Sequence, residues 1–353
     1  MSRADTARRA AVQIAFDGVD ITKSIKPYFL SMTYTDNEED KTDDLQILLQ
    51  DREQLWIEKW LEKAVDAAAA AKLRMEAVIV RENWNGDGKD EILPCGSFEL
   101  DSVEAAGPPS AITIQGTSLA FSESIRQTEK SKAWEAYHLS GIAGEMAASA
   151  GMSLLYEAGT DPYYNRAEQI KTSDISFLST LCHNAGISLK ATGHLLVLFD
   201  QAAYEGKPAV CTIRRGSGSY ISYDLKTGSA ETKYASCRVS YVDPSGKCIE
   251  AIATDPEQKD SSATKQRLEI TAKVSSIAEA QVLAKKLLRL RNKYEKTATF
   301  TLPGNPSLAA GVTVVLEKWG AWSGRYIVKQ AQHTVNDGGY TTKLTLRRCI
   351  EGY

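Results

Sequence analysis

The chain has few of the residues and motifs on which most enzymes depend. Its 353 residues include only four histidines, which are His138, His183, His194 and His333. None lies in an H-E-x-x-H metalloprotease motif, and the sequence has neither a G-x-S-x-G nucleophile elbow nor a G-x-x-x-x-G-K-[ST] phosphate-binding loop. We therefore predict no catalytic, cofactor-binding or metal-binding residue, and no cofactor.

Cysteine is sparse and scattered. No two of the six cysteines have C-x-x-C spacing, so the sequence does not support a zinc ribbon. A disulfide framework is uncommon in a cytosolic chain of this length. We expect buried thiols that pack as small apolar groups, at Cys95, Cys182, Cys211, Cys237, Cys248 and Cys349.

An excess of positive charge is also lacking. The formal net charge is -3 and the isoelectric point is near 5.9, whereas a nucleic-acid-binding domain usually has a value above about 9. The basic clusters are short and indicate solvated faces; they are Lys285, Lys286, Arg289 and Arg291, and the pair Arg214 and Arg215. We predict no specific nucleic-acid partner.

Long hydrophobic runs are absent as well. No stretch approaches the roughly 18 apolar residues of a membrane span, and residues 1–9 are polar, without the apolar core of a signal peptide. We expect no membrane span, and we expect that the chain is made in the cytoplasm and stays there until assembly.

The first part of the chain has mainly the alternation of β-strands. Apolar and polar residues alternate over 11–35, and the acidic run from Asp36 to Asp44 is interpreted as a solvated loop. Residues 51–72 change to helical spacing. The segment Asn83–Glu91 has part of a calcium-loop pattern, but Pro94 stands where such a loop needs a carboxylate. Its Asn-Gly and Asp-Gly pairs favour a hairpin turn instead.

The middle part has two helical stripes, and each ends at a glycine, Gly151 and Gly186. A strand-like run follows each glycine, so the segment predicts a repeated helix–glycine–strand unit. Cys182 and His183 are neighbours on the second helix and point to different faces, which argues against a catalytic dyad. Gly216-Ser-Gly-Ser219 is interpreted as a flexible connector.

The last part returns to strands after one clearly marked helix. Ser276 and Glu279 form a capping box before an apolar stripe. The predicted fold class is α+β, mainly β. We predict a first β domain over 1–120, a middle α/β domain and connector over 121–229, and a second β domain over 230–353 with a helix at 276–293.

Several segments, in this order, resemble the phage late control protein D family, the baseplate hub proteins of contractile tails, which are related to the hub part of VgrG. The N-terminal and middle segments are Phe16–Lys23, Tyr34–Asn37, Thr42–Asp51, Trp56 with Trp60, Gly96–Asp101, Gly107–Pro109 and Thr172–Gly186. The C-terminal segments are Glu279-Ala280, Thr301–Pro306, Ala310-Gly311, Gly324–Tyr326, His333 and Gly339–Thr342. The alanine-rich stretch 62–72 is longer than the family's usual link.

The resemblance implies two tail-tube-like β-barrel domains, each with a helix, and a small α/β middle domain. It implies a homotrimeric ring that adapts a hexameric tail tube to a trimeric spike in the baseplate of a virion or tail-like particle. The implied partners are other copies of the chain, the spike protein, the tail tube or tube-initiator protein and other baseplate proteins, with the tape measure protein as a further candidate.

Other interpretations remain open. The chain fits a hub of a type VI or extracellular contractile injection system as well as a phage or tailocin hub. A baseplate-associated protein that binds or hydrolyses peptidoglycan is the alternative from a different class. Four tryptophans fit a barrel core or rim, or anchors at an interface; they are Trp56, Trp60, Trp319 and Trp322.

Overall fold

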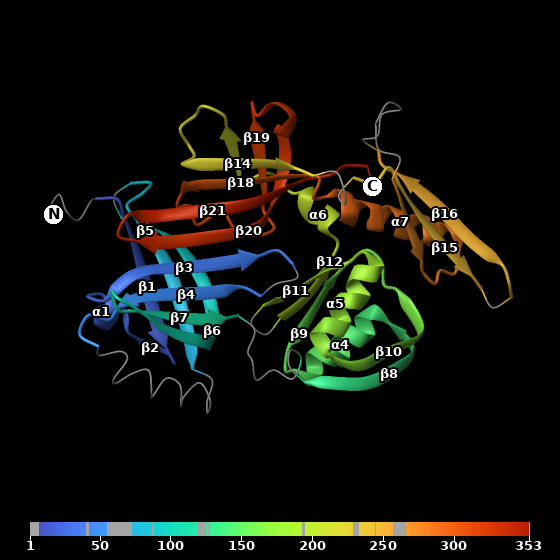
Figure 1. Ribbon diagram of the computed structural model, residues 1–353, viewed down its shortest axis with the longest axis horizontal. Coiled ribbons are helices and arrows are strands. Elements are labelled where there is room, and N and C mark those ends of the chain that lie inside the picture. Colours follow the sequence, from blue (N-terminus) through green and yellow to red (C-terminus); the bar gives the residue numbers. More distant parts are fainter. Residues whose placement is uncertain are drawn as a thin grey trace.

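The computed structural model confirms a mainly β fold with a few helices (Figure 1). It describes residues 7–39, 42–54, 73–86, 88–118, 125, 128–192, 195–228, 233–243, 245–256 and 266–352. The helix expected at 51–72, Trp56, Trp60 and His194 therefore lie wholly or largely outside the described residues. No helix within the described ranges is long and apolar enough to cross a membrane.

The N-terminal unit is an antiparallel sheet that alternates buried and exposed side chains along its strands. Its elements are β1 (Arg9–Phe16), β2 (Val19–Asp20), α1 (Thr22–Ile25), β3 (Phe29–Asn37), β4 (Asp44–Gln50), β5 (Arg74–Glu82), β6 (Glu91–Ala106) and β7 (Ala111–Thr117). β4 shows the alternation most clearly, because Leu45, Ile47 and Leu49 are all buried in one apolar core. The expected hairpin is confirmed, since β5 and β6 pair on either side of residues 83–90.

The C-terminal unit continues the same sheet. Its elements are β13 (Cys211–Arg214), β14 (Ser222–Thr227), β18 (Lys296–Pro303), β19 (Thr313–Glu317), the 3-10 turn Gly320–Trp322, β20 (Gly324–Asn336) and β21 (Gly339–Arg348). β20 pairs with β3 from Gln330 opposite Asn37 to Asn336 opposite Ser31. The two units thus share one 13-stranded sheet, in the order β14-β18-β21-β20-β3-β4-β7-β6-β5-β1-β2. Over the described strands this sheet does not close on itself, so closed barrels stay a prediction.

The middle unit is a small α/β domain, as predicted. Its elements are β8 (Glu129–His138), α4 (Leu139–Ser149), β9 (Ser153–Glu157), β10 (Tyr163–Ser173), α5 (Asp174–Ala185), β11 (Ser188–Thr192), β12 (Leu195–Phe199) and the short α6 (Gln201–Glu205). The repeated helix–glycine–strand unit is present. Gly151 and Gly186 follow α4 and α5 in the left-handed region, at φ 69° and 67°, before β9 and β11.

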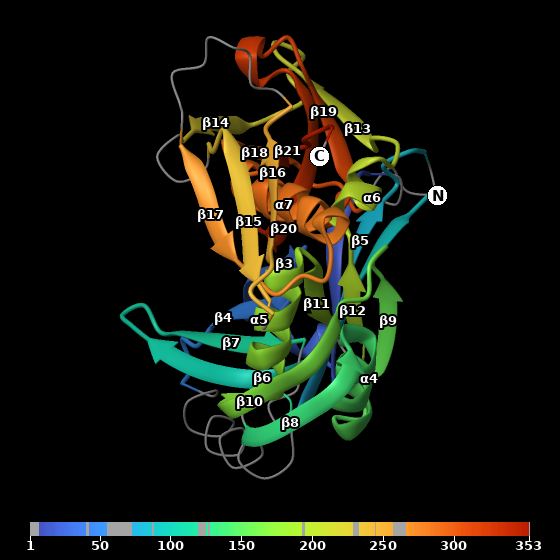
Figure 2. The same ribbon diagram turned by 90° about the vertical axis from the view of Figure 1, so that its right-hand side faces the viewer.

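The helix near residue 280 packs differently from the prediction. β15 (Ser236–Val242), β16 (Cys248–Thr254) and β17 (Arg267–Thr271) form a separate three-stranded sheet, which is covered by α7 (Ile277–Asn292). The predicted cap is present, because Ser276 Oγ accepts from the Glu279 backbone at 3.1 Å. This unit has an apolar core of its own, and Figure 2 shows it beside the large sheet.

The domain limits at 120 and 229 stay a prediction, but the strand pairing places β13 and β14 with the C-terminal unit. β13 pairs with β19 and β14 pairs with β18, although residues 211–227 were expected in the middle segment.

The six cysteines form no disulfide bond. Cys95, Cys182 and Cys237 are buried as expected, and Cys211 and Cys349 are half-buried, but Cys248 is exposed.

Candidate functional site

The four units meet at a buried polar junction, which we define by four acidic residues at the end of β3 and the start of the next strand. Asp36, Glu38, Glu39 and Asp43 are each at most 8% exposed. The prediction of a solvated loop was wrong for these four residues, because each of their carboxylates has a partner from a distant part of the chain. Since a buried carboxylate is costly unless it is paired, these pairs determine how the units sit together.

Arg347 on β21 is the most deeply buried charge of the junction, with no exposed side-chain surface. Its Nη2 donates to Glu38 Oε1 at 2.7 Å, and its Nη1 donates to Glu205 on α6. Burial acts to lower the pKa of Arg347, but the charges of Glu38 and Glu205 outweigh burial and raise that pKa. Arg289 Nη2 of α7 lies 2.6 Å from the other oxygen of Glu205, so α6 is bound to both α7 and β21.

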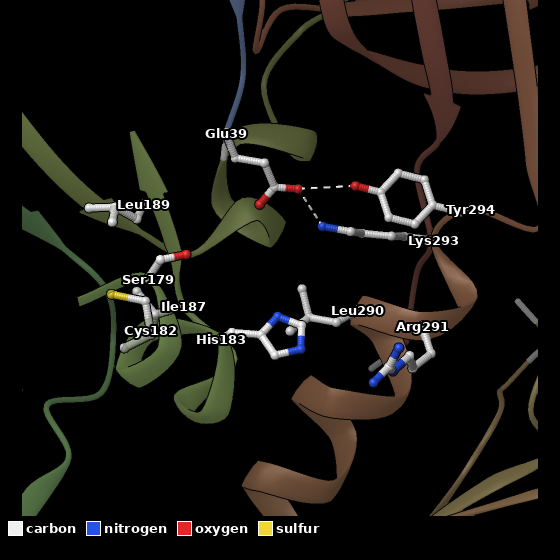
Figure 3. Close-up of a pocket in the computed structure, with 10 residues that line it drawn as sticks. All are labelled: Glu39, Ser179, Cys182, His183, Ile187, Leu189, Leu290, Arg291, Lys293 and Tyr294. Carbon is white, nitrogen blue, oxygen red and sulfur yellow. Dashed lines mark hydrogen bonds and ion pairs between the residues drawn. The ribbon is translucent and has the colours of Figure 1, made fainter. Parts of the chain in front are cut away.

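Glu39 is the second centre of the junction (Figure 3). Its Oε1 accepts from Lys293 Nζ at 2.6 Å and from Tyr294 Oη at 3.2 Å, and its Oε2 accepts from Ser188 Oγ at 2.7 Å. Burial acts to raise the pKa of Glu39, but Lys293, Ser188 and Gln201 together lower it to about 2. The end of β3, the start of β11 and the end of α7 are therefore joined at one carboxylate.

Lys190 on β11 is the third centre. Its Nζ lies 2.8 Å from Asp36 Oδ1 and 3.6 Å from Asp43 Oδ1. Burial raises the pKa of Asp43 to about 6, against the attraction of Lys190. Asp36 Oδ2 also accepts from the backbone of Ala310 at 2.8 Å, so this carboxylate links the middle unit to the C-terminal unit.

The junction is polar. The buried apolar residues of the described ranges form four separate clusters, each mainly in one unit, although Val335 of β20 belongs to the cluster of the N-terminal unit. Two cavities lie beside the junction, of about 250 and 270 Å³, and Leu290 on α7 lines both. The arrangement favours one register of the units, because a buried charge that loses its partner is costly.

The residues weighed in the sequence for chemistry are not brought together in a catalytic arrangement. The Cys182 sulfur points away from the His183 ring in the smaller cavity (Figure 3). His333 is buried in the large sheet, and His138 is exposed on β8, where its Nδ1 lies 3.1 Å from the backbone oxygen of Asp161. Searched over the described positions alone, His, Cys, Asp and Glu form no group of three suited to a metal ion.

The basic clusters and tryptophans are only partly as expected. Arg289 is buried against Glu205, so the prediction of a solvated face was wrong for this residue. Arg214 is exposed and pairs with Glu317 at 2.9 Å. Trp319 is buried in the core of the C-terminal unit and Trp322 packs against it, which supports the core interpretation for both.

Comparisons of sequence find similarity to two phage proteins and to one family model. A family model described as YQBQ-like matches residues 247–347. The "Probable baseplate hub protein" of Escherichia phage 186 is 24% identical over 391 residues, covering 97% of this chain and 94% of that protein. The protein of the same description from Escherichia phage P2 is 30% identical over 193 residues, covering 52% of this chain and 44% of that protein.

Solved structures share the fold at low identity. A tail protein from Neisseria meningitidis has a TM-score of 0.68 at 14% identity, covering 96% of this chain and 97% of that chain. A component of the Escherichia coli type VI secretion system has a TM-score of 0.53 at 9% identity, covering 96% and 78%. A Francisella PdpA–VgrG complex gives 0.55 at 6% identity, covering 98% and 59%.

The fold is thus shared with a tail protein, a type VI secretion component and a chain of a PdpA–VgrG complex. The chain is a homologue of the baseplate hub proteins of phages 186 and P2, which confirms the resemblance seen in the sequence.

Proposed function

We propose that the chain is a structural baseplate hub that acts as a symmetry adaptor. Three copies form a ring, so that the two sheet-forming units of each copy present six similar surfaces to a hexameric tail tube. The opposite side of the ring keeps the threefold symmetry of a trimeric spike. The observation that carries the proposal is the similarity over almost the whole chain to the hub protein of phage 186.

Two features of the fold support a ring. Each chain has two β units fused edge to edge through β3 and β20, and a closed threefold ring needs two different contact surfaces on each copy. β14 stands at one end of the large sheet, and among the described strands only β18 pairs with it. Ile221 and Tyr223 beside this edge are 61% and 48% exposed. Such an edge is a surface that an assembly covers.

The proposed mechanism is mechanical. The hub joins the tube to the spike, carries the force of contraction and then opens a passage. The buried ion pairs suit this task, because Lys293–Glu39 and Lys190–Asp36 join the α7 and middle units to the sheet, and Arg347–Glu38 joins the two halves of the sheet. No step of this mechanism needs a catalytic group or a cofactor, and we propose that the chain is not an enzyme.

The proposed partners are other copies of the chain, the spike protein, the tube or tube-initiator protein and other baseplate proteins, with the tape measure protein as a further candidate. The proposed location is the baseplate of a virion or tail-like particle, after assembly in the bacterial cytoplasm.

The first test is the mass in solution of the purified chain, alone and after co-expression with the adjacent spike gene. A trimer, or a complex of three hubs and three spikes, supports the adaptor. A persistent monomer in both preparations would contradict it. The alternative of a cell-wall hydrolase is tested in parallel, since a hydrolase clears a peptidoglycan suspension and a hub does not.

The genes that neighbour this one distinguish a phage hub from a type VI or extracellular injection hub. Tape-measure and tail-completion genes beside this one indicate a phage or tailocin tail. A secretion-type ATPase gene indicates a type VI system.

A further inference from the structure

The larger of the two cavities, about 270 Å³, lies between α7 and the segment that leads into α6. We call it the α6–α7 cavity. Its α7 side is lined by Val282, Lys285, Lys286, Arg289 and Leu290, and Ala202 on α6 faces them. Gly186 lets α7 come this close, because a Cβ atom there would lie 2.6 Å from the Cβ of Lys286.

The charges around the α6–α7 cavity do not all cancel. Lys286 Nζ lies 3.0 Å from Asp200 Oδ1, and Arg289 lies 2.6 Å from Glu205, so both of these cations are neutralised within the chain. Lys285 is exposed at the rim, and no ion pair to it is found among the described side chains. One positive charge is therefore left over at the mouth of the cavity.

Besides the polar Ser188 and Gln201, the rest of the lining is aliphatic apart from Gly186. Val282 is 45% exposed although it lies on the wall of a cavity, and Leu290 and Ala202 add further aliphatic surface. Exposed aliphatic surface around a hollow is a place where a partner's bulky side chain can fill the pocket and exclude water. The remaining charge on Lys285 favours a carboxylate next to that side chain.

We propose that the α6–α7 cavity receives one bulky apolar side chain from an acidic segment of another protein of the same tail. The apolar side chain packs on Val282 and Leu290, and a neighbouring carboxylate pairs with Lys285. The identity of the partner as a tail protein rests on the proposed hub function, whereas the chemistry of the segment rests on the lining of the cavity.

The test compares two pairs of matched variants in the particle that encodes the chain. Val282→Glu and Ile277→Glu each place a carboxylate on an exposed aliphatic position of α7, but only Val282 lines the α6–α7 cavity. Lys285→Glu and Arg291→Glu each reverse an exposed charge on the same helix, but Arg291 lines the smaller cavity. We expect Val282→Glu and Lys285→Glu to lower the yield of finished particles roughly tenfold or more, because each places a carboxylate against the partner's apolar side chain or its carboxylate.

The proposal is overturned if Val282→Glu and Lys285→Glu give the same yield as their matched controls while the purified variants keep the thermal midpoint of the parent. A variant with a lowered thermal midpoint is replaced by Val282→Thr or Lys285→Gln. These substitutions alter the size and charge of the side chain less, and we expect them to reduce the yield of particles as well.

A photoreactive amino acid in place of Val282 gives an independent result in assembled particles. A cross-link to a segment of another tail protein that contains a bulky apolar residue beside Asp or Glu supports the proposal. A cross-link only to a second copy of this chain, to lipid or to nucleic acid contradicts it. If purified particles do not contain the chain at all, the proposed function fails instead, so the two failures are distinguishable.

Discussion

Lys293 and Glu39 form a fully buried ion pair across more than 250 residues of sequence, with 2.6 Å between Nζ and Oε1 and side chains 4% and 5% exposed. Burial and the nearby Arg347 cation lower the pKa of Lys293, and Glu39 acts against both. Each residue therefore needs its partner to remain charged in the buried site. The pair connects the end of α7 to the end of β3.

Removal of one member of this pair is expected to destabilise the protein more than removal of both. Lys293→Met leaves Glu39 buried without its cation, which costs about 3–5 kcal/mol of the free energy of unfolding. The double variant Lys293→Met with Glu39→Gln removes both charges and recovers part of that loss. Urea unfolding followed by circular dichroism measures both values. A double variant that is less stable than Lys293→Met would contradict this account.

Glu39 also predicts a pH dependence with a definite sign. Its folded-state pKa is about 2, below its usual value of 4.5, so its stabilising contribution is present above about pH 4.5 and is lost as the pH falls toward 2. A difference of this size corresponds to about 3 kcal/mol. We expect the gap in unfolding free energy between the parent and Glu39→Gln to be largest near neutral pH and to shrink below pH 4.5. A gap that is constant from pH 6 to pH 3 would show that Glu39 is not held ionised by its partners.

The turn after β18 depends on the absence of a side chain at Gly304. A Cβ atom there would lie 2.1 Å from Cγ of Tyr340, which is much closer than van der Waals contact with the ring allows. The ring cannot easily move away, because Tyr340 Oη is 2.8 Å from His333 Nδ1 and the Tyr340 backbone oxygen accepts from Gly304 at 2.8 Å. Gly304→Ala is expected to cost about 1–3 kcal/mol, as overpacking does.

The matched control for this change is Gly206→Ala. Gly206 has φ -72°, and a Cβ atom there meets nothing closer than 3.5 Å, so a change within about 0.5 kcal/mol is expected. Equal thermal midpoints for the two variants would contradict the proposed contact. The contact joins two segments of the family resemblance, because Tyr340 of Gly339–Thr342 lies on Gly304 of Thr301–Pro306.

The parts of the fold that the sequence predicts are those set by local periodicity. The helices that became α4, α5 and α7 could be read from apolar stripes, terminal glycines and a capping box, and each was present. The hairpin at residues 83–90 followed from its Asn-Gly and Asp-Gly pairs. All of these features depend on residues within a few positions of one another.

The candidate site could not be predicted, because its partners are distant in sequence. Asp36 to Asp44 resembles any solvated acidic loop until Lys190, Lys293 and Arg347 are placed beside it. Arg289 and Lys293 lie four residues apart on one face of α7, but Ala284 and Leu288 of the apolar stripe lie on a different face of that helix. The local pattern therefore does not mark these two cations as buried, and it does not say which acids pair with them.

His333 provides a second pH-dependent contribution, inside the sheet. It is 1% exposed, its Nε2 lies 3.0 Å from the Leu308 backbone oxygen, and its Nδ1 lies 2.8 Å from Tyr340 Oη. This arrangement fits a neutral ring that donates from Nε2 and accepts at Nδ1. Burial lowers the pKa of His333 from 6.5 to about 4.

Between pH 6.5 and 4 the unfolded chain therefore binds a proton at His333 more readily than the folded chain does. The stability that the neutral ring contributes is present above pH 6.5 and is lost as the pH falls through 4, by an amount on the order of 3 kcal/mol. The variant His333→Gln keeps a polar side chain but cannot titrate, so its unfolding free energy should fall less over this interval than that of the parent. Urea unfolding at pH 7, 5.5 and 4 measures the difference. Parallel pH profiles for the two proteins would mean that the histidine is solvated or charged in the folded state, and that the sheet joining the two β units is less tightly packed around it than the geometry indicates.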